Sequence, residues 1–281
     1  MLITGESGTG KELVARVLHE SGNAADNPFM AINCAALPHE LIESELFGHV
    51  RGAFTGAVTD KPGLFQLAGD GTLFLDVIAE LAISLQAKLL RAIERKEFLP
   101  VGGVRPVGYG ARLVAATNRN LEKEVEAGRF REDLYYRVRV IEIRLPPLRE
   151  RVEDIPLLVE HILSRLTARL NRRIRGVATE AMRALIASRW RGNVRELENV
   201  LERAVILADH ELLGIGDLPA ELTDKLQGVE PTMDLRAAVL AFELEHIGRV
   251  LAQTNGNREQ AARLLGIDPS TLYRRLKELE A

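Results

Sequence analysis

The amino-acid sequence predicts an α/β protein: a parallel sheet with helices on both faces, then a helical lid, then a C-terminal all-α helix-turn-helix domain. Three observations support this prediction. Strand-like apolar runs alternate with helical patterns up to about residue 145, the pattern becomes wholly helical after Pro146–Pro147, and a glycine- and proline-containing stretch precedes three further helices. The expected divisions are an α/β subdomain over 1–145, a lid over 146–223, a linker over 224–232 and a helix-turn-helix domain over 233–281.

A short apolar strand, Met1–Thr4, leads directly into a glycine-rich loop with the spacing G-x-x-x-x-G-K. In such a loop the backbone N–H groups face a polyphosphate, the following helix offers its positive end, and the lysine reaches the outer phosphates. This predicts an ATP or GTP site. The residues expected to bind the nucleotide are Gly5, Glu6, Ser7, Gly8, Thr9, Gly10, Lys11 and Glu12. Because Glu12 stands where Ser or Thr usually helps to hold Mg²⁺, the metal must depend on other ligands.

Hydrophobic periodicity predicts the remaining elements. A helix is expected over Glu12–Glu20, with Leu13, Val17 and Leu18 as its apolar positions. The expected strands are Phe29–Cys34 (buried), Gly71–Asp76, Ala111–Asn118 and Val138–Leu145, with a hairpin formed by Phe98–Val101 and Val104–Val107. The expected helices are one that begins at Pro38, then Ser84–Glu94, Ile155–Leu170, Thr179–Ser188, Asn193–Ala208, Leu235–Gln253, Arg258–Leu265 and Pro269–Glu280.

The strand that ends at Asp76 predicts the second half of a nucleoside-triphosphatase site. A carboxylate at this strand tip lies across from the phosphate loop and binds Mg²⁺ directly or through water. The alternative is a strand that merely ends in an aspartate turn. A second carboxylate usually follows to polarise the attacking water, and here that residue is Val77. Glu80 is a poor substitute, because three further residues of chain displace it by several ångströms.

Bulk composition excludes several classes of protein. The 281 residues carry a net charge of −3, so any DNA contact must be local rather than driven by overall charge. Cys34 is the only cysteine, which rules out an internal disulfide and suits a reducing cytoplasm. The sequence contains no apolar run long enough to span a bilayer, and its six histidines have no metal-ligand spacing.

The C-terminal segment resembles a helix-turn-helix, with small residues at Ala261 and Ala262 and a turn over Leu265–Asp268. The residues expected to contact DNA are Ser270, Thr271, Tyr273, Arg274, Arg275 and Lys277. A helical dimerisation or packing module is the alternative. Residues 257–281 hold five basic and four acidic residues, so one copy attracts DNA weakly and a dimer is expected.

Together these stretches resemble the bacterial enhancer-binding proteins, the AAA+ ATPases that activate transcription by sigma-54 RNA polymerase. The most specific match is the family's GAFTGA loop, reproduced residue for residue by Gly52, Ala53, Phe54, Thr55, Gly56 and Ala57. The resemblance implies that this loop contacts the sigma factor and that the Gly102–Gly103 hairpin is a second pore-facing loop. It also implies ATP and Mg²⁺ as cofactors, enhancer DNA as a partner, and a homo-oligomer in which dimers assemble into a hexameric ring.

The same resemblance assigns further residues. Asp76 corresponds to the Walker B metal ligand, Asn118 to the sensor of the γ-phosphate, and Arg195 to the lid arginine that senses nucleotide. Arg131 and Arg137, in a stretch similar to FREDLYYRL, correspond to arginine fingers that reach the neighbouring subunit's site. Only four residues precede Gly5, so we expect that the N-terminal regulatory domain and the start of the AAA+ domain lie outside this sequence.

Three departures from the family pattern bear on activity. Val77 replaces the Walker B glutamate, and Asn33, which resembles the residue that holds this glutamate in its inactive position, is left without its partner. Val50 replaces a glutamate just before the GAFTGA loop, and Arg191 replaces a proline before Gly192. The first hypothesis is an ATP-driven activator. The second is a DNA-binding regulator that binds ATP but hydrolyses it poorly. A generic AAA+ unfoldase is disfavoured by the GAFTGA loop and by the DNA-binding tail.

Overall fold

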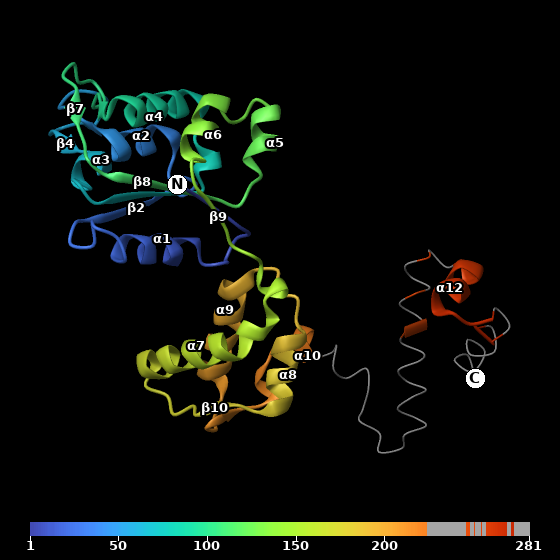
Figure 1. Ribbon diagram of the computed structural model, residues 1–281. Coiled ribbons are helices and arrows are strands. Elements are labelled where there is room, and N and C mark those ends of the chain that lie inside the picture. The colour runs from blue at the N-terminus through green and yellow to red at the C-terminus, as the bar shows by residue number, and fades with distance from the viewer. Residues whose placement is uncertain (224–245, 248–249, 251–253, 255–256, 269–270, 273–281) are drawn as a thin grey trace. The chain divides into compact units, whose positions relative to one another are not determined.

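The computed structural model describes residues 1–223, 246–247, 250, 254, 257–268 and 271–272 (Figure 1). The chain divides into two compact units, Met1–Leu213 and Gly214–Ala281. The first unit contains a parallel sheet and a helical lid. The described part of the second unit contains short helices and a small apolar cluster. Among the described residues, no helix is long and apolar enough to cross a membrane.

Five parallel strands form the central sheet in the order β2-β5-β8-β1-β9. Their bounds are β1 Leu2–Thr4, β2 Phe29–Asn33, β5 Thr72–Asp76, β8 Arg112–Thr117 and β9 Glu142–Arg144. Both faces of the sheet are covered: Leu73 and Leu75 of β5 enter one apolar cluster, and Phe74 between them enters another. Burial on both faces explains why the central strands read as continuous apolar runs in the sequence.

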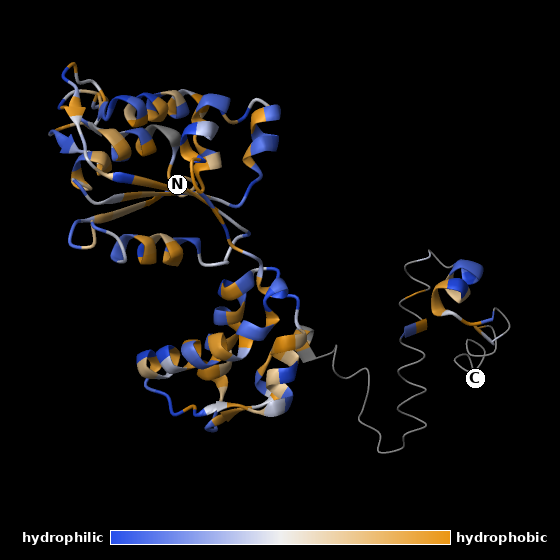
Figure 2. Ribbon diagram, viewed as in Figure 1, coloured by the Kyte–Doolittle hydropathy of each residue, from blue (hydrophilic) through white to orange (hydrophobic). Residues whose placement is uncertain are grey.

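Helices cover the two faces of the sheet unequally (Figure 1). One face is covered by α1 (Lys11–Glu20), and the other by α2 His39–Phe47, α3 Leu64–Leu67, α4 Ile83–Arg95, α5 Leu121–Glu126 and α6 Glu132–Val138. Each of these helices contributes apolar residues to the clusters that cover the sheet, and Figure 2 shows apolar and hydrophilic residues mixed along them. The prediction of helices on both faces is therefore confirmed. Short pairs of strands lie outside the sheet: β3 Gly48–His49 with β4 Lys61–Pro62, and β6 Glu97–Phe98 with β7 Val107–Gly108.

The predicted apolar stripe of α1 is wrong at Leu13 and Val17, whereas its third position, Leu18, packs against a buried cluster. Leu13 and Val17 are 66% and 51% exposed, whereas Lys11, Ala15 and His19 are buried. The phosphate loop turns Lys11 inward, and positions four and eight residues further along a helix lie on the same side. Leu13 and Val17 therefore face outward, although each is more apolar than the buried residues.

Two strand predictions also need correction. The strand expected to be buried at Phe29–Cys34 ends at Asn33 and is the edge strand β2, with Ala31 and Asn33 exposed. The strand expected to start at Val138 starts instead at Glu142, because α6 continues to Val138 and buries Leu134, Tyr135 and Val138 at helical spacing. The predicted hairpin forms, but it pairs β6 with β7, and Val101 bridges His49 instead.

The lid contains the helices α7 (Ile155–Leu170), α8 (Thr179–Ala187) and α9 (Asn193–Leu207). The 3₁₀ turns η2 (Leu148–Glu150) and η3 (Val152–Asp154) precede α7. The lid is not wholly helical as expected, because β10 Gly176–Val177 and β11 Leu212–Leu213 pair in parallel. Trp190, which is 2% exposed, donates from Nε1 to the Leu185 carbonyl oxygen at 2.8 Å.

In the second unit the described elements are η4 (Ile215–Asp217), α10 (Ala220–Thr223) and α12 (Arg258–Leu265), and α12 has the predicted bounds. Asn257 caps the start of α12 and Gly266 ends it with a φ of 66°. The small residues Ala261 and Ala262 are buried in one cluster with Ile247, Val250 and Leu272. The predicted linker 224–232 and most of the predicted helices Leu235–Gln253 and Pro269–Glu280 lie outside the described residues.

Candidate functional site

The phosphate loop joins β1 to α1 at the carboxyl edge of the sheet. Gly8 and Gly10 have φ values of 79° and 99°, which glycine adopts with little strain. Lys11 is 9% exposed, and its Nζ donates to the carbonyl oxygens of Gly5 and Glu6 at 2.9 and 2.8 Å. The Thr9 hydroxyl donates to the Glu6 carbonyl at 2.9 Å. The loop is thus held in a tight curl at the start of a ten-residue helix.

Asp76 ends β5 and lies in the electrostatic field of this loop. Burial raises the pKa of Asp76, and the positive charge of Lys11 opposes that rise. Burial in turn lowers the pKa of Lys11, and the charge of Asp76 opposes that change. Arg195 and Glu12 also act on Asp76. The structure therefore brings four residues predicted from distant parts of the sequence, Lys11, Glu12, Asp76 and Arg195, into one site.

The parallel strands β2 and β8 place two further polar residues at the same edge. Asn33 at the end of β2 is the register partner of Asp76. Asn118, which is exposed, directly follows β8, and the carbonyl oxygen of Thr117 before it accepts from the Gly5 N–H at 3.3 Å. Asn118 therefore follows a residue that is bonded to the first residue of the phosphate loop.

Val77 follows Asp76 in the left-handed region, with φ 55° and ψ 47°, and its N–H donates to Asp76 Oδ1 at 3.0 Å. Glu80, at the end of the 3₁₀ turn η1 (Ile78–Glu80), forms an ion pair with Arg119. Glu80 is therefore engaged by a residue that follows β8. Among the described residues, no group of three or more His, Cys, Asp or Glu side chains is arranged to hold a metal ion.

The conformation of Val77 makes a prediction about stability. A left-handed backbone costs about 1–2 kcal/mol for most residues and is least tolerated by β-branched side chains, whereas asparagine adopts it readily. Val77→Asn should therefore stabilise the protein by about 1 kcal/mol, which raises the melting temperature by about 2–4 °C. Val17→Asn on the exposed face of α1 is the matched control, because its backbone is helical. Equal melting temperatures for the Val77→Asn and unmodified proteins would contradict the claim that the backbone of Val77 is strained.

The two predicted arginine fingers lie on and next to α6, and each interacts with a residue outside the phosphate loop. The guanidinium of Arg131 pairs with Asp133 at 2.6 Å. Arg137 acts electrostatically on Tyr109, whose pKa is raised by burial to about 12 with Arg137 opposing. Neither arginine is among the charges that shift the pKa of Asp76 or Lys11.

Asn193, for which the sequence predicts no role of its own, lies against the phosphate loop. This residue is 0% exposed, and its Nδ2 donates to the Ser7 carbonyl oxygen at 2.9 Å. The family resemblance singles out Arg195, two residues further along the chain. The contact of Asn193 joins it to Ser7, which lies 186 residues away in the sequence. The only signal was an asparagine at a helix start, which is too general to predict a partner.

The GAFTGA hexapeptide forms a compact, exposed loop. The Gly52 N–H donates to the Ala57 carbonyl oxygen at 2.8 Å and closes the loop. Phe54 is 41% exposed, and its ring packs edge-on against the His49 ring with centroids 5.0 Å apart. The hairpin supports the base of the loop, since the Val50 N–H donates to the Val101 carbonyl at 3.1 Å.

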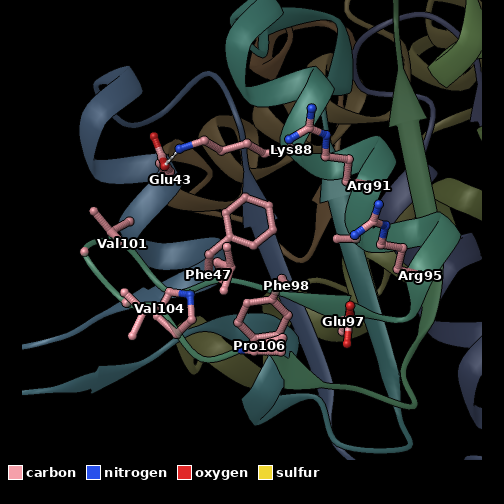
Figure 3. A pocket seen from close by; sticks show the side chains of 15 residues that line it. Glu43, Phe47, Lys88, Arg91, Arg95, Glu97, Phe98, Val101, Val104 and Pro106 are labelled. Atoms are coloured by element: carbon pink, nitrogen blue, oxygen red, sulfur yellow. Dashed lines mark hydrogen bonds and ion pairs between the residues drawn. The ribbon is translucent and has the colours of Figure 1, made fainter.

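A pocket of about 580 Å³ opens beside this hairpin (Figure 3). Its wall on α4 carries Lys88, which pairs with Glu43, together with Arg91 and Arg95. Phe47 and Phe98 contribute apolar surface. None of the residues predicted to bind nucleotide lines this pocket. The pocket is therefore separate from the nucleotide site, and its hairpin side adjoins the GAFTGA loop.

The predicted DNA contacts are mostly outside the described residues: Ser270, Tyr273, Arg274, Arg275 and Lys277. Thr271 is described, and its N–H donates to the Asp268 carbonyl oxygen at 2.9 Å, as expected near the start of a helix. Its DNA contact stays a prediction.

The residues at the edge of the sheet fit a nucleotide with its magnesium ion. A buried lysine and a curled glycine loop suit a polyphosphate, and Mg²⁺ in such sites usually takes one or two carboxylates together with phosphate oxygens and water. Asp76 can supply one such carboxylate. The fold and the site thus define a P-loop nucleoside-triphosphate module of the AAA+ type with a helical lid.

Comparison with known proteins narrows this class. Residues 1–144 match the sigma-54 interaction domain, residues 149–234 the AAA+ ATPase lid domain, and residues 239–279 the Fis family of bacterial regulatory proteins. The chain therefore belongs to the family of sigma-54-dependent transcriptional activators, with an AAA+ domain and a Fis-type helix-turn-helix domain. This confirms both the resemblance and the predicted fold class.

Individual relatives agree with this assignment. The response regulator protein PilR of Pseudomonas aeruginosa is 47% identical over 282 residues, which cover 99% of this chain and 63% of PilR. The regulatory protein AtoC of Escherichia coli is 46% identical over 285 residues, covering 99% and 62%. The crystal structure of NtrX from Brucella abortus in complex with ADP has a TM-score of 0.76 at 36% identity and covers 100% of this chain and 64% of NtrX. The chain thus spans less than two thirds of the length of these relatives.

Proposed function

We propose that this chain is an ATP-dependent transcriptional activator that remodels sigma-54 RNA polymerase through the loop Gly52–Ala57 while bound to enhancer DNA. The observation that carries the proposal is the closed, exposed loop with Phe54 on its surface, in a domain that matches the sigma-54 interaction domain. An exposed aromatic side chain on a hydrogen-bonded loop is well suited to anchor a protein contact. A cytoplasmic location is part of the same proposal.

The phosphate loop is proposed to bind ATP with Mg²⁺. Lys11 would hold the outer phosphates, Asp76 would hold the metal, and Asn118 and Arg195 would contact the γ-phosphate from the strand tip and from the lid. The clustering of Lys11, Asp76 and Arg195 supports these roles. NtrX of Brucella abortus, which has the related fold, has been crystallised with ADP and with ATP. When bound, ATP would supply the energy that drives remodelling.

Assembly into a ring of identical chains, with dimers forming a hexamer, is proposed from the arginine fingers. Arg131 pairs with Asp133 and Arg137 acts on Tyr109, so neither contact assigns these arginines to the phosphate site of their own chain. An arginine supplied in trans stabilises the charge that develops during phosphoryl transfer. Arg131 would have to leave Asp133 to do so.

A second candidate function is an ATP-binding regulator that does not hydrolyse ATP efficiently. Two observations favour it: Val77 provides no carboxylate after Asp76, and the nearby Glu80 is paired with Arg119. Such a chain would remain in its ATP-bound form and act as a locked assembly on DNA. The predicted DNA-binding residues from Ser270 to Lys277 serve either function.

Removal of the Phe54 side chain tests the main proposal. Phe54→Ala should weaken binding of purified sigma-54 to the chain, in the presence of ATP and Mg²⁺, by about thirtyfold, the effect of an aromatic hot spot worth about 2 kcal/mol. Leu67→Ala is the control, because Leu67 on α3 is similarly exposed, at 46%. Native affinity in Phe54→Ala, measured by biolayer interferometry, would contradict the proposed contact.

A further inference from the structure

A buried amide joins the lid to the phosphate loop. Asn193, the first residue of α9, is 0% exposed and uses both ends of its side chain. Its Nδ2 donates to the Ser7 carbonyl oxygen at 2.9 Å and to Glu6 Oε2 at 3.2 Å. Its Oδ1 accepts from the Leu148 N–H at 2.8 Å. One side chain therefore connects the phosphate loop, the start of the lid and α9.

Two independent features of this position favour asparagine. First, the amide donates to the phosphate loop and accepts from the Leu148 N–H. Aspartate has no donor for the loop, and a serine or threonine hydroxyl is too short to reach both partners. The backbone of Asn193 has a φ of 55°, in the left-handed region that asparagine tolerates better than most residues. Both the side chain and the backbone conformation therefore restrict what this site accepts.

The surrounding contacts join the same two parts of the unit. The Val194 N–H donates to the Gly8 carbonyl at 3.0 Å, and a Cβ on Gly8 would lie 2.2 Å from the Gly192 carbonyl oxygen. Arg149 pairs with Glu6 at 2.6 Å. The Arg151 guanidinium donates to the Thr9 carbonyl at 3.2 Å. Lid residues thus bond both the backbone of the loop from Glu6 to Thr9 and the side-chain carboxylate of Glu6.

We propose that Asn193 is a positioning residue for nucleotide binding: it fixes the phosphate loop in its binding conformation through the Ser7 carbonyl and the Glu6 carboxylate. This inference rests on the proposed binding of ATP by the loop. Asn193 acts through the loop and does not contact the nucleotide. Its role therefore differs from the nucleotide sensing that the family resemblance gives Arg195.

Equilibrium binding of a fluorescent ATP analogue with Mg²⁺ to the whole chain tests the inference. Asn193→Asp removes the donor and places a carboxylate beside that of Glu6. A buried, unsatisfied polar group costs about 1–3 kcal/mol, so the dissociation constant should rise by about ten- to a hundredfold. Asn171→Asp is the matched control, because Asn171 also has a positive φ, of 50°, but lies exposed at the end of α7.

Rescue separates positioning from general structural damage. Adding Glu6→Gln to Asn193→Asp supplies an amide that donates to the new carboxylate, so the double variant should recover part of the lost affinity, whereas the Ser7 carbonyl remains without its donor. Glu6→Gln alone should weaken binding only a few fold, through the loss of the charged partner of Arg149. A purely structural role for Asn193 predicts no recovery, because the second change removes a further native interaction.

Each outcome bears on the inference. Native affinity in Asn193→Asp, or a loss of affinity that Glu6→Gln leaves undiminished, overturns it while the nucleotide site of the unmodified chain stands. Failure of the unmodified chain to bind the analogue overturns the proposed function and the inference together. If Asn193→Asp does not fold, the neutral variant Asn193→Ser is measured instead. A tenfold loss is then expected, and native affinity would overturn the positioning role.

Discussion

Val77→Glu should raise ATP turnover by about 10²–10⁴-fold, the range expected for a positioned general base. The substitution places a carboxylate directly after Asp76, which is the proposed metal ligand and the register partner of Asn33 on β2. Glu80 does not take this place in the unmodified chain, since it is paired with Arg119. Phosphate release at several protein concentrations measures the effect. Turnover should rise with concentration if arginines act between subunits.

A neutral substitution separates base catalysis from relief of backbone strain. Val77→Gln removes the β-branch of Val77 in the same way as Val77→Glu but cannot accept a proton from water. It should leave turnover at the level of the unmodified chain. If the unmodified chain already turns over ATP as fast as Val77→Glu, another group activates the water, and the hydrolysis-deficient candidate is wrong.

Lys11→Ala should weaken ATP binding by about a hundredfold. The Lys11 ammonium is the cation closest to the phosphate loop backbone, and a hydrogen bond to a charged group contributes about 1.5–3 kcal/mol. Isothermal titration with ATP and Mg²⁺ measures the change. Lys88→Ala on α4 is the control, because it removes a lysine that pairs with Glu43 outside the site. If Lys11→Ala binds ATP with an affinity within threefold of that of the unmodified chain, the proposal that ATP binds at the phosphate loop is contradicted.

Much of the fold was predictable because local patterns determine helices. The helices Ile155–Leu170 and Arg258–Leu265 have the predicted bounds, since their apolar periodicity and their ends are both visible in the sequence. The inward face of α1 was not predictable from hydrophobicity. The phosphate loop orients that helix through Lys11, and the apolar Leu13 and Val17 are left exposed.

The candidate site was predictable where it depends on the carboxyl ends of parallel strands. Asp76 ends β5 and Asn118 follows β8, and both lie at the edge of the sheet that carries Lys11, as the βα pattern requires. Asn193 was not predictable, because its partners Ser7 and Leu148 come from distant segments and only packing of the lid on the loop brings them together. The contact between Val101 and Val50 that supports the GAFTGA loop likewise depends on tertiary structure.

The most direct test is to identify the nucleotide that stays bound after the chain is mixed with ATP. It shows whether the site binds ATP and whether Val77 limits hydrolysis there. The chain and its Val77→Glu variant are incubated at high concentration with labelled ATP and Mg²⁺, isolated at intervals, and their bound ATP and ADP are separated. We predict that the unmodified chain retains ATP while Val77→Glu accumulates ADP. Accumulation of ADP at the same rate in both would contradict the hydrolysis-deficient candidate and leave the ATP-driven activator standing. The absence of bound nucleotide from both would contradict the proposed ATP site itself.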